Sequence, residues 1–189
     1  EDQKQHLELT RDIAKKFNND FKCGDYFPVV EPLIQKEISR VMSLRDGTKK
    51  MSKSEDSDQS RINLKDDKDL INQKIKKAKT DNDPIPSEVN GLKNRHEAAN
   101  LISIYASVNN INVAEVLKEF SGKNFSTLKS KLSESLIERI CPIGNEMKKL
   151  LGDKHYLNQI LEKGSKKADI IAKNNLKEIY EIIGLTKFT

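Results

Sequence analysis

The sequence has 189 residues, of which 35% are hydrophobic and 33% charged, and its formal net charge is +5. These apolar residues can build a core, but no run approaches the roughly 18 residues that cross a bilayer, and the charged opening EDQKQHLELT shows no signal peptide. We therefore expect no membrane association, while the slight basic excess permits binding to a polyanion without requiring it.

The cysteines and histidines give no sign of a metal site. Cys23 and Cys141 lie far apart and in no CxxC arrangement. This disfavours a disulfide scaffold or a zinc ribbon and favours a reducing compartment, so we expect a cytoplasmic protein. His6, His96 and His155 are isolated from one another, and we predict no metal ligands among them.

The first half of the chain predicts one helix, one strand and two loops. Residues 4–22 place their apolar side chains on one helical face. Two prolines in residues 23–34 make a continuous helix implausible there and predict a loop with short extended pieces. The apolar, partly β-branched stretch 38–44 is typical of a buried strand, and residues 45–63 form a long polar loop.

The second half is dominated by helical patterns. Asp66 or Asp67 should cap a helix that extends to about Ala78, with a basic face formed by residues 74–79. A linker rich in Asp, Asn, Pro and Gly follows at residues 80–95, where we place a domain boundary. The predicted picture is an α/β fragment followed by an all-helical domain. The helices expected in that domain are 96–108, 112–120, 126–140 with a kinked continuation past Pro142 to about 151, 153–163 and 165–183.

The polar loop holds a group of residues suited to phosphate chemistry. Lys50 and Lys53 are separated by two residues, so they can reach different oxygens of one triphosphate. The hydroxyls of Ser52 and Ser54 and the backbone amides can add hydrogen bonds. Loops rich in lysine and serine are most often simply solvated, and no GxxxxGK[ST] pattern occurs here. The residue types alone therefore leave both interpretations open.

The order of the letters in this loop resembles a known family. KMSKS, residues 50–54, matches the second signature of class I aminoacyl-tRNA synthetases. The wider stretch RVMSLRDGTKKMSKSEDSDQSRINL at 40–64, followed by KIKKAKTD at 74–81, closely resembles bacterial-type tryptophanyl-tRNA synthetases. The opening EDQKQHLELTRDIAKKFN at 1–18 and the segment ANLISIYA at 99–106 are similar to the same family.

The resemblance implies an activity and a fold. Such enzymes join L-tryptophan and ATP into tryptophanyl-adenylate, release pyrophosphate and charge tRNA(Trp), with Mg²⁺ accompanying the ATP. They are homodimers with a Rossmann-type catalytic domain. Residues 1–88 would then be the C-terminal part of that domain, with the KMSKS loop, and residues 89–189 a helical tRNA anticodon-binding domain. The family's HIGH-type motif does not occur, so we expect a C-terminal half that is inactive alone.

The resemblance also assigns site residues. Glu1 and Asp2 match an acidic pair beside the ATP ribose, and Gln3 matches a glutamine near the bound amino acid. Without the family, Asp2 would be interpreted as a first-turn helix carboxylate. Val41 matches the position whose backbone meets the adenine, and it ends a short apolar stretch, where an open α/β sheet places its ligand.

Within the loop, the resemblance makes residues 50–54 the ATP-binding segment. Lys50 and Lys53 are the expected catalytic, phosphate-stabilising pair. Ser52 and Ser54 are expected to contact ATP as well, and Met51 is expected near the nucleotide base.

Two alternatives remain. The chain can belong to another class I synthetase, of which the tyrosyl enzyme is the nearest relative. It can also be a non-catalytic helical RNA-binding protein in which the KMSKS match is accidental. Several lysines of the helical part can meet RNA phosphates, but solvated helix faces are the favoured interpretation for most of them. They include Lys118, Lys123, Lys129 and Lys131.

Overall fold

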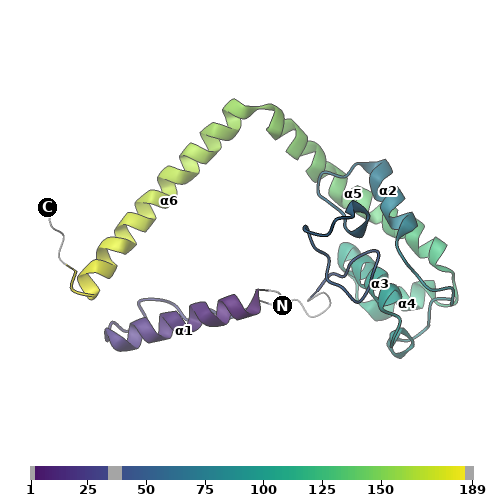
Figure 1. Ribbon diagram of the computed structural model, residues 1–189, viewed down its shortest axis with the longest axis horizontal. Coiled ribbons are helices and arrows are strands. Elements are labelled where there is room, and N and C mark those ends of the chain that lie inside the picture. Colours follow the sequence, from purple (N-terminus) through teal and green to yellow (C-terminus); the bar gives the residue numbers. More distant parts are fainter. Residues whose placement is uncertain (1–2, 34–39, 186–189) are drawn as a thin grey trace. The chain divides into compact units, whose positions relative to one another are not determined.

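Helices dominate the described part of the chain. The computed structural model describes residues 3–33 and 40–185 (Figure 1). Within these ranges, pairing between extended segments is confined to one isolated antiparallel bridge, which joins Met42 to Lys50. The helical elements are α1 (Lys4–Asp20), η1 (Asp58–Ser60), α2 (Lys68–Lys77), η2 (Val89–Leu92), α3 (His96–Asn109), α4 (Val113–Phe120), α5 (Phe125–Gly152) and α6 (Lys154–Ile182), where η marks a short 3₁₀ helix.

The chain divides into two compact units. The first unit contains residues 1–34 together with 150–189, and the second unit contains residues 35–149. In the first unit, the ring of Phe17 on α1 lies 4.9 Å from the rings of both Phe21 and Phe27. These contacts fold the proline-containing loop back onto the end of α1, and the absence of a helix in residues 23–33 confirms the expected loop.

The second unit is built around one hydrophobic core. Figure 1 shows α2, α3, α4 and the first part of α5 gathered around it. The core forms because each of these helices carries an apolar stripe at helical spacing. In α4 a capping box between Asn112 and Glu115 satisfies the first backbone amides. Fully buried core side chains are Ile71, Ile75, Leu101, Ile102, Val116, Leu117, Phe120, Leu128 and Leu132.

The strand predicted for residues 38–44 is wrong for its described part. Residues 38 and 39 lie outside the described residues, and residues 40–44 contain only the bridge position Met42. The pairing with the segment around Lys50 is limited to this one bridge, and on its other edge the backbone of Met42 is bound by a side chain and not by a further strand. The amide of Asn100 on α3 accepts from Met42 N–H at 3.0 Å and donates to its carbonyl at 2.9 Å.

Asp67, one of the two residues predicted to cap α2, is the N-cap of this helix. Its side chain accepts a hydrogen bond from the backbone amide of Leu70 at 2.9 Å. The neighbouring Asp66 is buried and has a different role, because it binds the ammonium group of Lys74 at 2.7 Å.

Of the two long helices, α5 agrees with the prediction and α6 does not. The continuation of α5 through Pro142 is confirmed. The break predicted between 163 and 165 is wrong, since α6 runs unbroken through Gly164. A glycine in a helix interior costs only about 1 kcal/mol relative to alanine, which is too little to end a helix by itself. The division at residues 88 and 89 stays a prediction, and so does the Rossmann-type part of the expected fold.

Candidate functional site

A tight turn opens the polar loop. The carboxylate of Asp46 accepts hydrogen bonds from the backbone amide of Thr48 at 3.0 Å and from its hydroxyl at 2.6 Å. The hydroxyl contact, followed by the amide contact, lowers the pKa of Asp46, so this carboxylate stays charged at neutral pH. A β-carbon on buried Gly47 would lie 2.6 Å from the backbone of His96 and Glu97 at the start of α3. Only glycine allows this approach.

Backbone hydrogen bonds pair the two stems that flank this turn, residues 41–43 and 49–51. Ser43 N–H donates to the carbonyl of Lys49 at 2.8 Å, and Met51 N–H donates to the carbonyl of Val41 at 3.0 Å. The Asn100 amide fixes the first stem to α3 from the other side. The KMSKS segment therefore starts from a well-anchored stem. The contact predicted between the backbone of Val41 and adenine stays a prediction.

Residues 52–54, which we call the apex, follow the second stem and carry one lysine between two serines in the sequence. The hydroxyls of Ser52 and Ser54 lie 2.9 Å apart, and the backbone amide of Ser54 donates to the Ser52 hydroxyl at 3.3 Å. Lys53 is exposed between them, and Lys50 is exposed at the end of the second stem. This arrangement places hydroxyl groups and positive charge on one short segment, which suits a polyanionic ligand.

A hollow of about 690 Å³ lies beside the apex. Its lining includes Met51, Ser52 and Lys53 from the loop, together with Arg61, Lys65 and Asp66. The lining thus combines three cations and one carboxylate with apolar side chains. A hollow of this composition can hold a ligand with anionic and apolar parts.

Some predicted site residues cannot be compared with the loop. Glu1 and Asp2 lie outside the described residues. Gln3 is the N-cap residue of α1, and its carbonyl accepts from Leu7 N–H at 3.2 Å. Gln3 belongs to the first unit and the loop to the second. The assigned contacts with ribose and amino acid therefore stay predictions.

Three charged residues behind the loop were missed by the sequence reasoning. Arg61 donates to two carbonyls of the loop, Asp58 binds Arg61, and Lys74 binds Asp58. Lys74 is completely buried, although the sequence suggested an exposed basic face for residues 74–79. A signal existed, because Lys74 stands three residues after Ile71 and therefore falls on the apolar face of α2.

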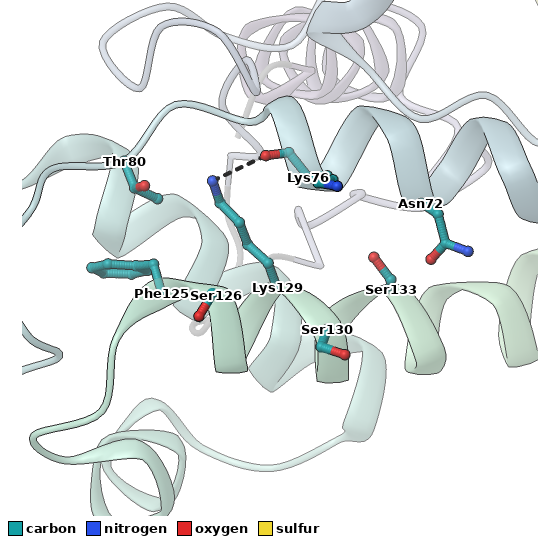
Figure 2. A pocket seen from close by; sticks show the side chains of 8 residues that line it. All are labelled: Asn72, Lys76, Thr80, Phe125, Ser126, Lys129, Ser130 and Ser133. Carbon is teal, nitrogen blue, oxygen red and sulfur yellow. Dashed lines mark hydrogen bonds between the residues drawn. The ribbon is translucent and has the colours of Figure 1, made fainter.

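A second hollow of about 450 Å³ lies between α2 and α5. Figure 2 shows the side chain of Lys129 reaching across it toward the end of α2. Its ammonium group donates to the carbonyl of Ala78 at 2.6 Å and to that of Lys76 at 3.4 Å. Burial lowers the pKa of Lys129. This lysine completes the C-terminus of α2, which differs from the solvated or RNA-facing position expected for it.

The described residues contain neither a candidate membrane-spanning helix nor a cluster of metal-binding side chains. Across residues 3–33 and 40–185, no helix is long and apolar enough to cross a membrane. In the same ranges, no three His, Cys, Asp or Glu side chains come together as they would around a metal ion. Cys23 and Cys141 are free thiols.

Comparisons with known proteins place this helical unit and its loop in a class. The chain is similar to the crystal structure of tryptophanyl-tRNA synthetase from Mycoplasma pneumoniae, with a TM-score of 0.79, 29% identity, and coverage of 98% of this chain and 57% of that chain. It is also similar to the enzyme from Campylobacter jejuni complexed with ADP and tryptophan, with a TM-score of 0.64, 28% identity, and coverage of 98% and 55%. Its fold neighbours are therefore class I synthetases.

The family follows from a match over most of the sequence. The family model for tRNA synthetases class I (W and Y) matches residues 1–140, and the chain belongs to this family. Tryptophan–tRNA ligase of Rhizobium meliloti is 52% identical over 97% of this chain and 57% of its own length. That of Mesorhizobium japonicum is 48% identical over 98% of this chain and 57% of its own length. The chain thus spans somewhat more than half the length of these relatives.

Proposed function

We propose that the protein to which this sequence belongs is a tryptophan–tRNA ligase. It would activate L-tryptophan with ATP, release pyrophosphate and transfer the tryptophanyl group to tRNA(Trp). The observation that carries this proposal is the anchored KMSKS loop with Lys53 at its apex, beside a hollow lined by cations. Relatives named tryptophan–tRNA ligase, about half identical in sequence to this chain, support the choice of tryptophan.

The loop's part in the reaction follows from charge. A carboxylate oxygen of tryptophan attacks the α-phosphorus of ATP, the bond from that phosphorus to the oxygen bridging to the β-phosphate breaks, and pyrophosphate leaves. Negative charge grows on the leaving phosphates, so the ammonium groups of Lys50 and Lys53 would stabilise them in the transition state. Ser52 and Ser54 would donate hydrogen bonds to the same groups, and Mg²⁺ would accompany the ATP.

The remaining contacts are proposed from the family. The backbone of Val41 would meet the adenine, with Met51 near the base. Glu1 and Asp2 would bind the ribose, and Gln3 would lie near the amino acid.

The family also suggests the organisation of the whole protein. Residues 1–88 would complete a Rossmann-type catalytic domain, and residues 89–189 would bind the tRNA anticodon. The enzyme would be a homodimer in the cytoplasm, and this chain by itself would not activate an amino acid.

The test is ATP–pyrophosphate exchange by the full-length protein. Tryptophan should drive the exchange. Lys53→Ala should lower its rate by about tenfold or more, while tryptophan affinity should hardly change, because the lost cation faces the phosphates. Lys68→Ala, which removes an exposed lysine from the start of α2, is the matched control and should leave the rate unaltered.

Other outcomes would point to the alternatives. Normal exchange by Lys53→Ala would remove the role assigned to this lysine. Exchange driven by tyrosine would move the protein to the tyrosyl branch of the family. No exchange with any amino acid, together with RNA binding that ignores ATP, would favour the non-catalytic alternative.

A further inference from the structure

Arg61 binds two backbone carbonyls at the apex of the KMSKS loop. Its Nη1 donates to the carbonyl of Glu55 at 2.9 Å and to that of Ser52 at 3.3 Å. These two carbonyls stand on either side of Lys53 in the sequence, so a single guanidinium group fixes the turn that carries this lysine. The side chain of Arg61 is only 18% exposed, which protects both hydrogen bonds from water.

The guanidinium group is itself held by a buried ion network. Its Nη2 lies 3.1 Å from one oxygen of Asp58, and the other oxygen of Asp58 lies 2.7 Å from the ammonium group of Lys74. Lys74 is completely buried and also binds Asp66, which is 5% exposed. The hydrogen bond from Lys74 lowers the pKa of Asp58, so Asp58 stays charged opposite Arg61. The support for the loop thus reaches down into α2.

We propose that Arg61 is a positioning residue for phosphate transfer, which Asp58 and Lys74 hold in place so that Lys53 is presented to the phosphates in one fixed geometry. This inference rests on the proposed function for the reaction it would serve. It deepens that function, because the loop would be partly pre-organised before ATP binds. A fixed cation needs no rearrangement as charge develops, whereas a mobile one must first be ordered.

The choice of arginine is part of the argument. A guanidinium group is planar and presents several N–H donors in fixed directions, so it can bind two carbonyls and a carboxylate at once. A lysine at the same place keeps the charge but cannot reproduce this planar arrangement of donors. Arg61→Lys therefore tests geometry separately from charge.

Arg95 provides a matched control in the same unit. Its side chain is 17% exposed and binds the carboxylate of Asp81. It also donates to the carbonyls of Pro84 and Asp83, each at 3.0 Å. Arg95 thus makes the same kinds of contact as Arg61, but to the segment before α3 and not to the KMSKS loop. Arg95→Lys should cost similar stability while it leaves the contacts of Arg61 with the apex intact.

The kinetic test uses tryptophan-dependent exchange by the full-length protein. Arg61→Lys should lower kcat by roughly tenfold or more with the KM for tryptophan unchanged, whereas Arg95→Lys should keep kcat within about twofold. In a Lys53→Ala background, Arg61→Lys should add no more than about twofold, because its effect passes through that lysine. Fully additive losses, or equal losses in both arginine variants, would overturn the proposal.

A second readout does not depend on activity. Backbone amides of residues 53–57 should exchange with deuterium about fivefold faster in Arg61→Lys than in the wild type, and no faster in Arg95→Lys. Asp58→Asn is a milder change at a half-exposed side chain and should accelerate the same amide exchange to a smaller extent. This variant replaces Arg61→Lys in the test if Arg61→Lys does not fold. Unchanged amide exchange in these variants would overturn the proposal. A wild type without any pyrophosphate exchange would instead reject only the proposed function.

Discussion

Replacing Lys74 by methionine is the sharpest test of the buried network. The substitution keeps an unbranched apolar stem and removes only the ammonium group. That group lies 2.7 Å from both Asp58 and Asp66, and no part of the Lys74 side chain is exposed. Asp66, which is nearly buried, would keep its charge without its cation. Asp58 is half exposed and can turn to water.

The expected loss of stability follows from this burial. Removing one partner of a buried ion pair costs about 3–5 kcal/mol, because the other charge stays buried and uncompensated. At roughly 2–4 °C per kcal/mol for a chain of this size, Tm should fall by about 6–20 °C. The measurement is thermal and urea unfolding of the purified protein, followed by circular dichroism.

Two further variants make the Lys74 result decisive. Lys79→Met breaks a 2.8 Å pair with Glu97 in which the lysine is 62% exposed, and it should shift Tm far less. Adding Asp66→Asn to Lys74→Met should restore part of the stability, because the stranded charge is removed. If Lys74→Met unfolded at the same urea concentration as the wild type, the reasoning on this buried network would be refuted.

Three other predictions concern separate parts of the second unit. Gly47→Ala should destabilise the protein by about 1–3 kcal/mol and slow pyrophosphate exchange, because the new β-carbon would meet the backbone of α3 and displace the loop. Thermal melting and pyrophosphate-exchange assays measure the two effects. Lys129→Met should cost about 1 kcal/mol in urea unfolding with unaltered exchange, since its hydrogen bonds serve only α2. The hydrogen bond from Arg95 lowers the pKa of Asp81, so its stabilisation is present above about pH 4 and is lost as the pH falls through the folded-state value. Asp81→Asn should flatten the decline of Tm below about pH 4, and an unchanged slope would contradict the assignment.

The sequence predicted the elements whose causes are local. Apolar spacing of 3.6 residues predicted the helices, since each buries one stripe, and the cap of α2 followed from an aspartate before an apolar run. The loop was predicted because nothing in residues 45–63 favours a core. The break placed near Gly164 was wrong because glycine weakens a helix by less than neighbouring residues can restore.

The features that sequence could not predict depend on distant partners. The second edge of Met42, opposite its bridge to Lys50, is bound by the side chain of Asn100, which is 58 residues away. The KMSKS letters indicated where phosphates would bind, but not that Arg61 holds the apex from behind. Lys74 was assigned to the basic face of residues 74–79 because of its charge. Its position on the apolar face of α2 was given less weight, so its contact with Asp66 was missed.

The two hydrogen bonds between the Asn100 side chain and the Met42 backbone also affect the order in which the protein folds. Contacts between residues so far apart in sequence form late, because a long stretch of chain must be closed before they contribute stability. Helix α3 must therefore be in place before the stems of the loop can settle against it. During synthesis the loop would leave the ribosome early and remain without its final shape until residue 100 had followed. On partial unfolding, any opening that frees α3 releases the loop and also removes Leu101 and Ile102 from the core, so the loop and the helical core lose their structure together.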